Sequence, residues 1–216
     1  MRWALMVATA ALLSGGCASV PLKTPSSAEP AEALWQSHKR AVADVVSWNL
    51  SGRIALRTAD MAASASLRWI RSESRDEIYL FGPLGGGKVQ LTIEPDAVTL
   101  RDARGQIVKG DDPSDVLYRV TGWHIPFEAL DDWIRGLPSS EPINAMAWDP
   151  DGRLTQLDQA GWEISYLDFM PVDVLFLPRK IRIAASDQTV DALVRAGQLN
   201  GDRLALRFFV ENWNQP

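Results

Sequence analysis

Polar and apolar residues alternate with a period of two along most of this chain. The alternation is clearest near the end, over residues 203–213, and it recurs through residues 48–100 and 145–185. Strands with one apolar and one wetted face form antiparallel sheets. The connections between them are short, so strands that are neighbours in sequence are expected to pair as a meander. The pattern predicts a mainly β protein of about 10–11 strands.

Three segments change to a helical period. Residues 31–47 place apolar side chains on one side of a helix. A second helix is expected after Asp112 and Pro113, which supply a cap and a proline suited to a helix start. A third begins at Pro126 and ends at Gly136. The two short helices interrupt the strands, so we expect them to lie against one face of the sheet.

A sheet of this size must curl, split in two or close. Barrels of more than about eight strands enclose space, so strands wrapped around short helices predict an apolar cavity, and such cavities bind apolar ligands. A β-sandwich could use the same strands and keep a solid core. Strand parity and the apolar stripe of the third helix place ten residues on the concave face: Leu50, Ile54, Leu67, Trp69, Leu91, Trp133, Trp162, Ile164, Leu206 and Phe208.

The N-terminus has the features of an export signal. A basic start is followed by an apolar run from Ala4 to Leu13, then by Ser14-Gly15-Gly16-Cys17. The run is shorter than the roughly 20 residues that span a bilayer. Small residues before the only cysteine resemble a bacterial lipobox, although Ser14 stands where Leu is commonest. Acylation of Cys17 would anchor the mature chain to a membrane.

This reading divides the chain into three parts. Residues 1–16 form the signal peptide, 17–30 form a lipidated flexible tether rich in Pro, Ser and Ala, and 31–216 form one domain. Ala18 follows the cysteine. By resemblance to bacterial lipoproteins, this residue directs the protein to the outer membrane, where the domain faces the periplasm.

Composition narrows the classes of function. The signal segment contains Arg2 and no acidic residue, so the mature chain keeps 21 Lys and Arg against 27 Asp and Glu. No basic footprint for nucleic acid is present. With its one thiol acylated, the domain can form no disulfide and must be stabilised by packing. We expect a monomer.

One loop carries glycine and lysine at the spacing of a phosphate-binding loop, over residues 82–88. Val89 stands where that motif needs Ser or Thr, and a strand follows in place of a helix. We therefore predict a hairpin loop. Leu84 is flanked there by three glycines, so it is either a tip that inserts into a membrane or a side chain folded back onto the core.

Candidate chemistry is otherwise sparse. The two histidines, His38 and His124, have no nucleophile or metal-ligand pattern around them. The sequence therefore predicts no enzyme, no metal site and no cofactor.

Seven short stretches together resemble the LolB family of outer-membrane lipoprotein receptors. They occur in order over most of residues 31–213: 48–56 (WNLSGRIAL), 64–69 (SASLRW), 82–85 (GPLG), 130–138 (LDDWIRGLP), 151–154 (DGRL), 159–162 (QAGW) and 212–213 (NW). The resemblance implies an incompletely closed antiparallel barrel with a helical lid over an apolar cavity. It also implies a protein that accepts lipoproteins from a periplasmic carrier and places them in the inner leaflet of the outer membrane.

The binding hypothesis is that the concave face holds the acyl chains of lipoproteins and that Leu84 delivers them to the bilayer. No energy source is visible, so transfer must run downhill from carrier to receptor to membrane. Two other classes remain open from the residues: a structural or assembly lipoprotein that binds envelope partners without carrying lipid, and a hydrolase with an unfamiliar site.

Overall fold

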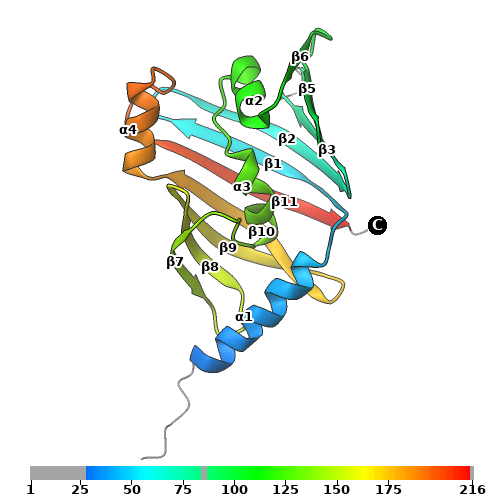
Figure 1. The fold of residues 1–216 in the computed structure, drawn as a ribbon, viewed down its shortest axis with the longest axis vertical. Coiled ribbons are helices and arrows are strands. Elements are labelled where there is room, and N and C mark those ends of the chain that lie inside the picture. The colour runs from blue at the N-terminus through cyan, green and yellow to red at the C-terminus, as the bar shows by residue number, and fades with distance from the viewer. Residues whose placement is uncertain (1–27, 84–86, 215–216) are drawn as a thin grey trace, which may run out of the picture.

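An 11-stranded antiparallel sheet curls around two short helices (Figure 1). The computed structural model describes residues 28–83 and 87–214. The strands are β1 (Trp48–Thr58), β2 (Ala62–Ser72), β3 (Arg75–Phe81), β4 (Lys88–Glu94), β5 (Ala97–Arg101), β6 (Ile107–Gly110), β7 (Ile143–Trp148), β8 (Leu154–Gln159), β9 (Trp162–Val172), β10 (Leu175–Ala185) and β11 (Leu204–Asn214). The fold class predicted from the alternation is confirmed.

Chain order and sheet order are nearly the same, as expected for a meander. Strands β1 to β6 are laid down in sequence on one side, and β7 to β11 on the other. The two halves meet where β1 pairs with β11, from Asn49 opposite Asn214 to Thr58 opposite Leu204. The short strands β6 and β7 stand at the two ends of the order, so the sheet is curled but not closed.

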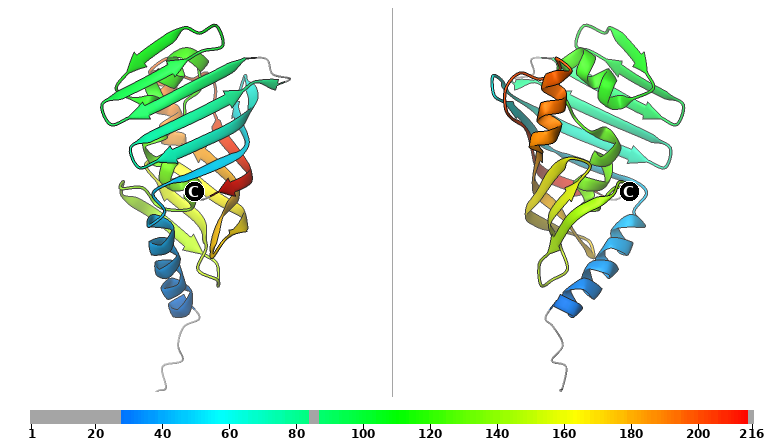
Figure 2. Two further views of the ribbon diagram at one scale, coloured as in Figure 1. Left: turned by 90° about the vertical axis from the view of Figure 1, so that its right-hand side faces the viewer. Right: turned by 60° about the vertical axis from the view of Figure 1, so that its left-hand side comes forward.

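Four helices accompany the sheet: α1 (Ala28–Ala43), α2 (Pro113–Thr121), α3 (Phe127–Arg135) and α4 (Asp187–Arg195). Figures 1 and 2 show α2 and α3 inside the curl, on the concave face, while α1 leans across one end of the sheet. Asp112 caps α2 by accepting from Ser114 N, and Gly122 and Gly136 end α2 and α3 in the left-handed conformation. The cap at Asp112 and the end at Gly136 were expected from the sequence, whereas the end of α2 at Gly122 was not predicted.

Helix α4 was not predicted, so the expectation of three helices is wrong. Its sequence is mostly polar, and Val190 is its one buried residue. A nine-residue helix with one buried residue has too weak a helical periodicity of apolar residues to be recognised from the sequence. Its start was nevertheless readable, because Ser186 accepts a hydrogen bond from Thr189 N as a helix cap.

The predicted apolar stripe of α1 is partly wrong. Trp35 and Val42 are each 1% exposed, but Leu34 is 50% exposed and Val46 lies beyond the helix at 58%. The helix docks through Trp35, which stacks on Trp148 of β7 with ring centroids 6.4 Å apart. Gly152, in the turn after β7, has φ +76° and leaves no room for a Cβ against the α1 backbone. This close approach explains why α1 packs on one narrow face.

The glycine-rich loop joins β3 to β4 as a hairpin, as predicted. Phe81 is paired with Lys88, and Gly82 N donates to Gly87 O at 3.0 Å. Lys88 begins a strand, and its Nζ lies 4.5 Å from the ring centroid of Tyr79, so no helix start faces this loop. Leu84 and Cys17 lie outside the described residues. Within the described part of the chain, no helix is long and apolar enough to cross a membrane.

Candidate functional site

The side chains predicted for the cavity wall come together on the concave face. Each of the ten is at most 7% exposed, and all belong to one apolar cluster. The register explains the grouping: Leu50 lies opposite Trp69 across β1 and β2, and Ile54 lies opposite Phe208 across β1 and β11. The same burial would describe a packed core, so a ligand-binding role for these residues stays a prediction.

Aromatic rings fill one end of this face. Trp48 lies with its ring centroid 5.2 Å from that of Trp69 and 5.3 Å from that of Trp213, and Trp69 lies 5.9 Å from Phe127 at the start of α3. Trp213 donates from Nε1 to the carbonyl of Pro178 at 2.9 Å. The Nε1 of Trp48 is buried and has no acceptor within the part of the chain that the structure describes. These tilted and edge-on pairs bury large apolar areas and tie α3 to the sheet.

A charged network holds α3 to β2 and β3. Arg71 on β2 lies 2.9 Å from Asp131 on α3 and 3.1 Å from Asp76 on β3. Arg135, at the end of α3, lies 3.2 Å from Asp131 and 2.9 Å from Asp132. Because these side chains are mostly shielded from water, the pairs fix the position of α3 more firmly than surface pairs would.

Asp76 is the most deeply placed carboxylate of that network. Its Oδ1 accepts from Trp69 Nε1 at 2.7 Å. Burial raises the pKa of Asp76 above its ordinary value, although the bond from Trp69 and the charge of Arg71 act in the opposite direction. Burial likewise raises the pKa of Asp132, against the charge of Arg135. The site therefore holds two carboxyls whose charged forms are poorly solvated.

Gln159 fixes the segment that follows α3. It is fully buried at the end of β8, where Oε1 accepts from Trp133 Nε1 and from Ser139 N, each at 2.9 Å. Its Nε2 donates to the carbonyls of Ser139 and Glu141. Tyr166 adds a bond from its hydroxyl to Trp133 O at 3.0 Å. With its polar groups satisfied in this way, the buried amide locks α3 in place.

The α2 side is held by fewer polar contacts. His124, between α2 and α3, lies with Nε2 2.9 Å from the carbonyl of Gln198, and the Tyr118 hydroxyl donates to the same carbonyl at 3.4 Å. The rings of Tyr118 and His124 stack with centroids 4.0 Å apart. No charged pair joins this side to the sheet among the described residues. Arg119 of α2 donates to the carbonyl of Lys109 on β6 at 3.2 Å, so α2 is held to the sheet by hydrogen bonds and apolar packing rather than by ion pairs.

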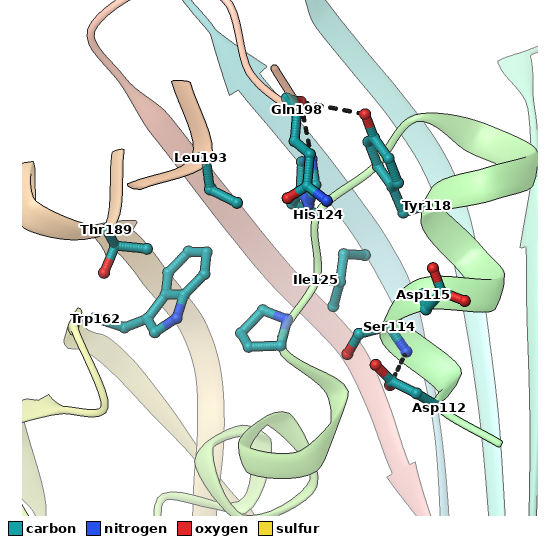
Figure 3. A pocket seen from close by; sticks show the side chains of 11 residues that line it. Asp112, Ser114, Asp115, Tyr118, His124, Ile125, Trp162, Thr189, Leu193 and Gln198 are labelled. Atoms are coloured by element: carbon teal, nitrogen blue, oxygen red, sulfur yellow. Dashed lines mark hydrogen bonds between the residues drawn. The ribbon is translucent and has the colours of Figure 1, made fainter. Parts of the chain in front are cut away.

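A cleft opens beside this contact, between α2, the 124–126 segment and α4 (Figure 3). It has a volume of about 340 Å³ and is mixed in character, with Trp162 and Leu193 on one side and Asp112, Ser114 and Tyr118 on the other. A second recess of about 500 Å³ shares Asp112, Ser114, Pro126 and Trp162 and reaches Trp133. Through Trp162 and Trp133, this cleft touches the apolar interior.

The polar residues that hold α3 were missed from the sequence. Asp76 precedes Ile78 by two residues and Gln159 follows Leu157 by two, so both have the parity of the concave face. An acid and an amide at inward positions of a strand were the available signal, because buried polar groups need partners. Within the described residues, no group of three His, Cys, Asp or Glu side chains is placed to hold a metal ion.

Comparison with known proteins identifies a single family over most of the chain. The family model for the outer membrane lipoprotein LolB matches residues 46–213. A relative from Stutzerimonas stutzeri is 31% identical over 194 residues, which cover 90% of this chain and 94% of the relative. Another, from Nitrosococcus oceani, is 31% identical over 216 residues, which cover 99% and 98%. Both relatives carry the name outer-membrane lipoprotein LolB.

Solved structures share the fold at low identity. A DUF1329 family protein from Desulfovibrio piger superposes with a TM-score of 0.52 at 7% identity, and a LolA superfamily protein from Nitrosomonas europaea with a TM-score of 0.50 at 6% identity. Each match covers 86% of this chain and 93% of the other. These likenesses concern the curled sheet with inner helices and carry no statement about ligands.

Proposed function

This chain belongs to the LolB family of outer membrane lipoproteins, and we propose that it works by sheltering the acyl chains of its cargo inside the curled sheet. It is an outer-membrane lipoprotein receptor that acts in lipoprotein localisation.

One observation carries the binding proposal: ten apolar side chains gather on the concave face, and one of them, Trp162, also lines the cleft beside α2. Each buried methylene contributes about 0.8 kcal/mol, so acyl chains cross water only inside such a shelter. In the described state the concave side chains are packed against α2 and α3. We propose that chains enter by displacing α2, which hydrogen bonds and apolar packing hold, while α3 stays fixed by Arg71 and Gln159.

The partners follow from this role. We propose that a periplasmic carrier delivers the lipoprotein and that the outer membrane receives it, with affinity rising at each step. No catalytic step is needed, because no covalent bond of the cargo changes. The anchor would be an acylated Cys17 on a tether that leads into α1 at Ala28, after removal of residues 1–16. Acylation adds a stable membrane attachment only when more than one chain is present.

Leu193 offers a test of the cleft. It lies on α4, is half-buried and points into the cleft in Figure 3. A carboxylate there would have to be desolvated by an entering chain, so Leu193→Glu should weaken binding of a fluorescent fatty acid at least about tenfold. Val194→Glu is the matched control, since Val194 is the next residue on α4, is 41% exposed and does not line the cleft. Equal fatty-acid affinities for the two variants, both shown to be folded by circular dichroism, would show that acyl chains do not enter through the cleft.

Leu84 is proposed as the residue that delivers cargo to the bilayer. Leu84→Glu should accept a lipoprotein from the loaded carrier at the wild-type rate and then fail to release it into liposomes. Ile107→Glu serves as the control, because Ile107 is another apolar residue, 49% exposed, on β6. Normal release by the Leu84 variant would show that the tip has no part in delivery.

A further inference from the structure

The outward face of the sheet, turned away from α2 and α3, carries a groove that acyl-chain binding does not use. It crosses β1, β2, β9, β10 and β11 and has a volume of about 770 Å³. Four of its 12 lining residues are basic, Arg53, Lys180, Arg182 and Arg207, and none is acidic. The chain as a whole has a formal net charge of −5, so the charge of this groove is opposite in sign to that of the chain. We call these four residues the basic groove.

Two of the arginines face each other without a counter-charge. Arg182 lies directly opposite Arg207 across β10 and β11. Their other cross-strand neighbours are Ser165 for Arg182 and Ala55 for Arg207. Within residues 28–83 and 87–214, no carboxylate lies within ion-pair distance of either guanidinium. Like charges directly opposite each other destabilise a sheet, so this pair costs stability and would gain from an external anion.

Acidic groups stand only at the margins of the basic groove. Arg53 lies 3.1 Å from Glu211, and Lys180 lies 3.5 Å from Asp168. A second recess adjoins the groove, shares Arg182 and Arg207 with it, and adds further arginines together with two aspartates. Surface pairs of this kind are weak, so they leave most of the positive potential of the face in place.

Apolar side chains are set among the cations. Leu167 lines the groove from β9 and is 66% exposed. Phe209 lies between two guanidinium groups, with the Arg53 Cζ 5.6 Å and the Arg179 Cζ 5.3 Å from its ring centroid. A surface that mixes arginines with an exposed leucine and an aromatic ring combines the positive charge and the apolar side chains with which proteins bind the membrane interface.

We propose that the basic groove docks on the anionic phospholipid headgroups of the membrane to which the receptor is confined. Each arginine near such a surface is attracted to the anionic headgroups, and confinement at the membrane raises the effective concentration enough for weak contacts to hold. The outward face then lies against the bilayer. Since α2, α3 and the cleft lie on the opposite face of the sheet (Figures 1 and 2), docking turns the cleft toward the periplasm, from which cargo arrives.

The test uses the lipid-anchored full chain in vesicles. Cys17 is the only cysteine, so acylation leaves no free thiol, and the unmodified chain gives the labelling background. A fluorophore is attached at Ser64→Cys, an exposed residue of the groove, or at Ser140→Cys, an exposed residue beside the recess on the cleft side. Quenching by headgroup spin-labelled lipid reports how close each label lies to the membrane.

In phosphatidylethanolamine vesicles with phosphatidylglycerol, the label at position 64 should be quenched and the label at position 140 should not. Salt at about 1 M, which shortens the screening length to about 3 Å, and Arg182→Ser with Arg207→Ser should each abolish the difference. Arg104→Ser with Arg195→Ser, which removes the same charge from exposed arginines outside the groove, should keep it. Equal quenching at both positions, no difference between anionic and zwitterionic vesicles, or shielding of position 64 only by an added acidic protein would overturn the proposal.

Discussion

At the scale of single residues, two buried tryptophans differ in what their N–H groups meet. Trp69 donates to Asp76 at 2.7 Å, whereas the buried N–H of Trp48 has no acceptor among residues 28–83 and 87–214. Both side chains are 2% exposed, and their rings pack against each other at a tilt of 57°. Removing the N–H should therefore have different consequences at two equally buried positions.

We expect Trp69→Phe to destabilise the fold by about 1–3 kcal/mol more than Trp48→Phe. The change at residue 69 leaves Asp76 Oδ1 without the donor from Trp69, whereas the change at residue 48 removes a donor that has no partner among the described residues. Loss of ring volume is the same in both. Urea unfolding followed by circular dichroism measures the difference, and equal losses of stability would show that the Trp69–Asp76 bond contributes nothing.

The raised pKa of Asp76 predicts a pH dependence of stability. On acidification the folded chain takes up this proton at a pH at which the unfolded chain does not, so the contribution of Asp76 to the free energy of unfolding rises as the pH falls from the raised native pKa toward the ordinary value of about 4. Asp76→Asn cannot take up the proton. The stability of the wild type minus that of the variant should therefore grow between about pH 7 and about pH 4.5.

The same pair of urea titrations, repeated for Asp96→Asn, supplies the control, because Asp96 is exposed in the turn between β4 and β5. A difference that stays constant or shrinks on acidification for Asp76→Asn would contradict a raised pKa.

The sequence predicted the inward apolar residues but not the buried polar ones. Strand parity correctly placed Leu50, Ile54 and Phe208 inward, because successive side chains of any strand point to opposite faces of the sheet. Parity could not identify the partners of the two buried polar residues. Asp76 bonds to Trp69 and Arg71 across the β2–β3 hairpin, and its link to α3 runs through Arg71 to Asp131. Gln159 bonds to Trp133 and Ser139, which are 26 and 20 residues away, and contacts over such a separation leave no local pattern.

At the scale of elements, α1 depends on the turn after β7. Gly152 has φ +76°, and a Cβ there would meet the α1 backbone at Leu34 and Trp35. Gly105 has a similar φ of +80° with nothing within 4 Å of the added atom. Gly105→Ala should cost about 1–2 kcal/mol from backbone strain alone, and Gly152→Ala should cost more because it also forces α1 away.

Urea unfolding gives the two stabilities, and hydrogen exchange of α1 shows whether the helix detaches. Similar losses in the two variants, with α1 still protected, would show that α1 tolerates a Cβ at residue 152.

The elements also differ in how well the sequence predicts them. Helix α4 could not be predicted from the hydrophobic pattern, because only Val190 is buried. The eleven-residue strands β1 and β11 could be predicted, because polar and apolar residues alternate along them.

At the scale of the molecule, the two faces of one sheet carry different tasks. The concave face is apolar and is covered by α3, which ion pairs hold, and by α2, which hydrogen bonds and apolar packing hold. The outward face is basic where β10 and β11 meet. The pairing of β1 with β11 joins both halves, so the same central strands supply Ile54 and Phe208 inward and Arg53 and Arg207 outward. A strand period of two is what allows one element to serve both faces.

Photo-cross-linking can locate the acyl chains that we propose to lie inside the sheet. The carrier is loaded with a lipoprotein whose acyl chain bears a photoreactive diazirine, the lipoprotein is passed to this receptor, and the cross-linked residues are mapped by mass spectrometry. We expect cross-links to inward residues of β1, β2, β9, β11 and α3, such as Leu67, Trp133 and Ile164. Cross-links confined to outward residues or to loops would contradict the proposal.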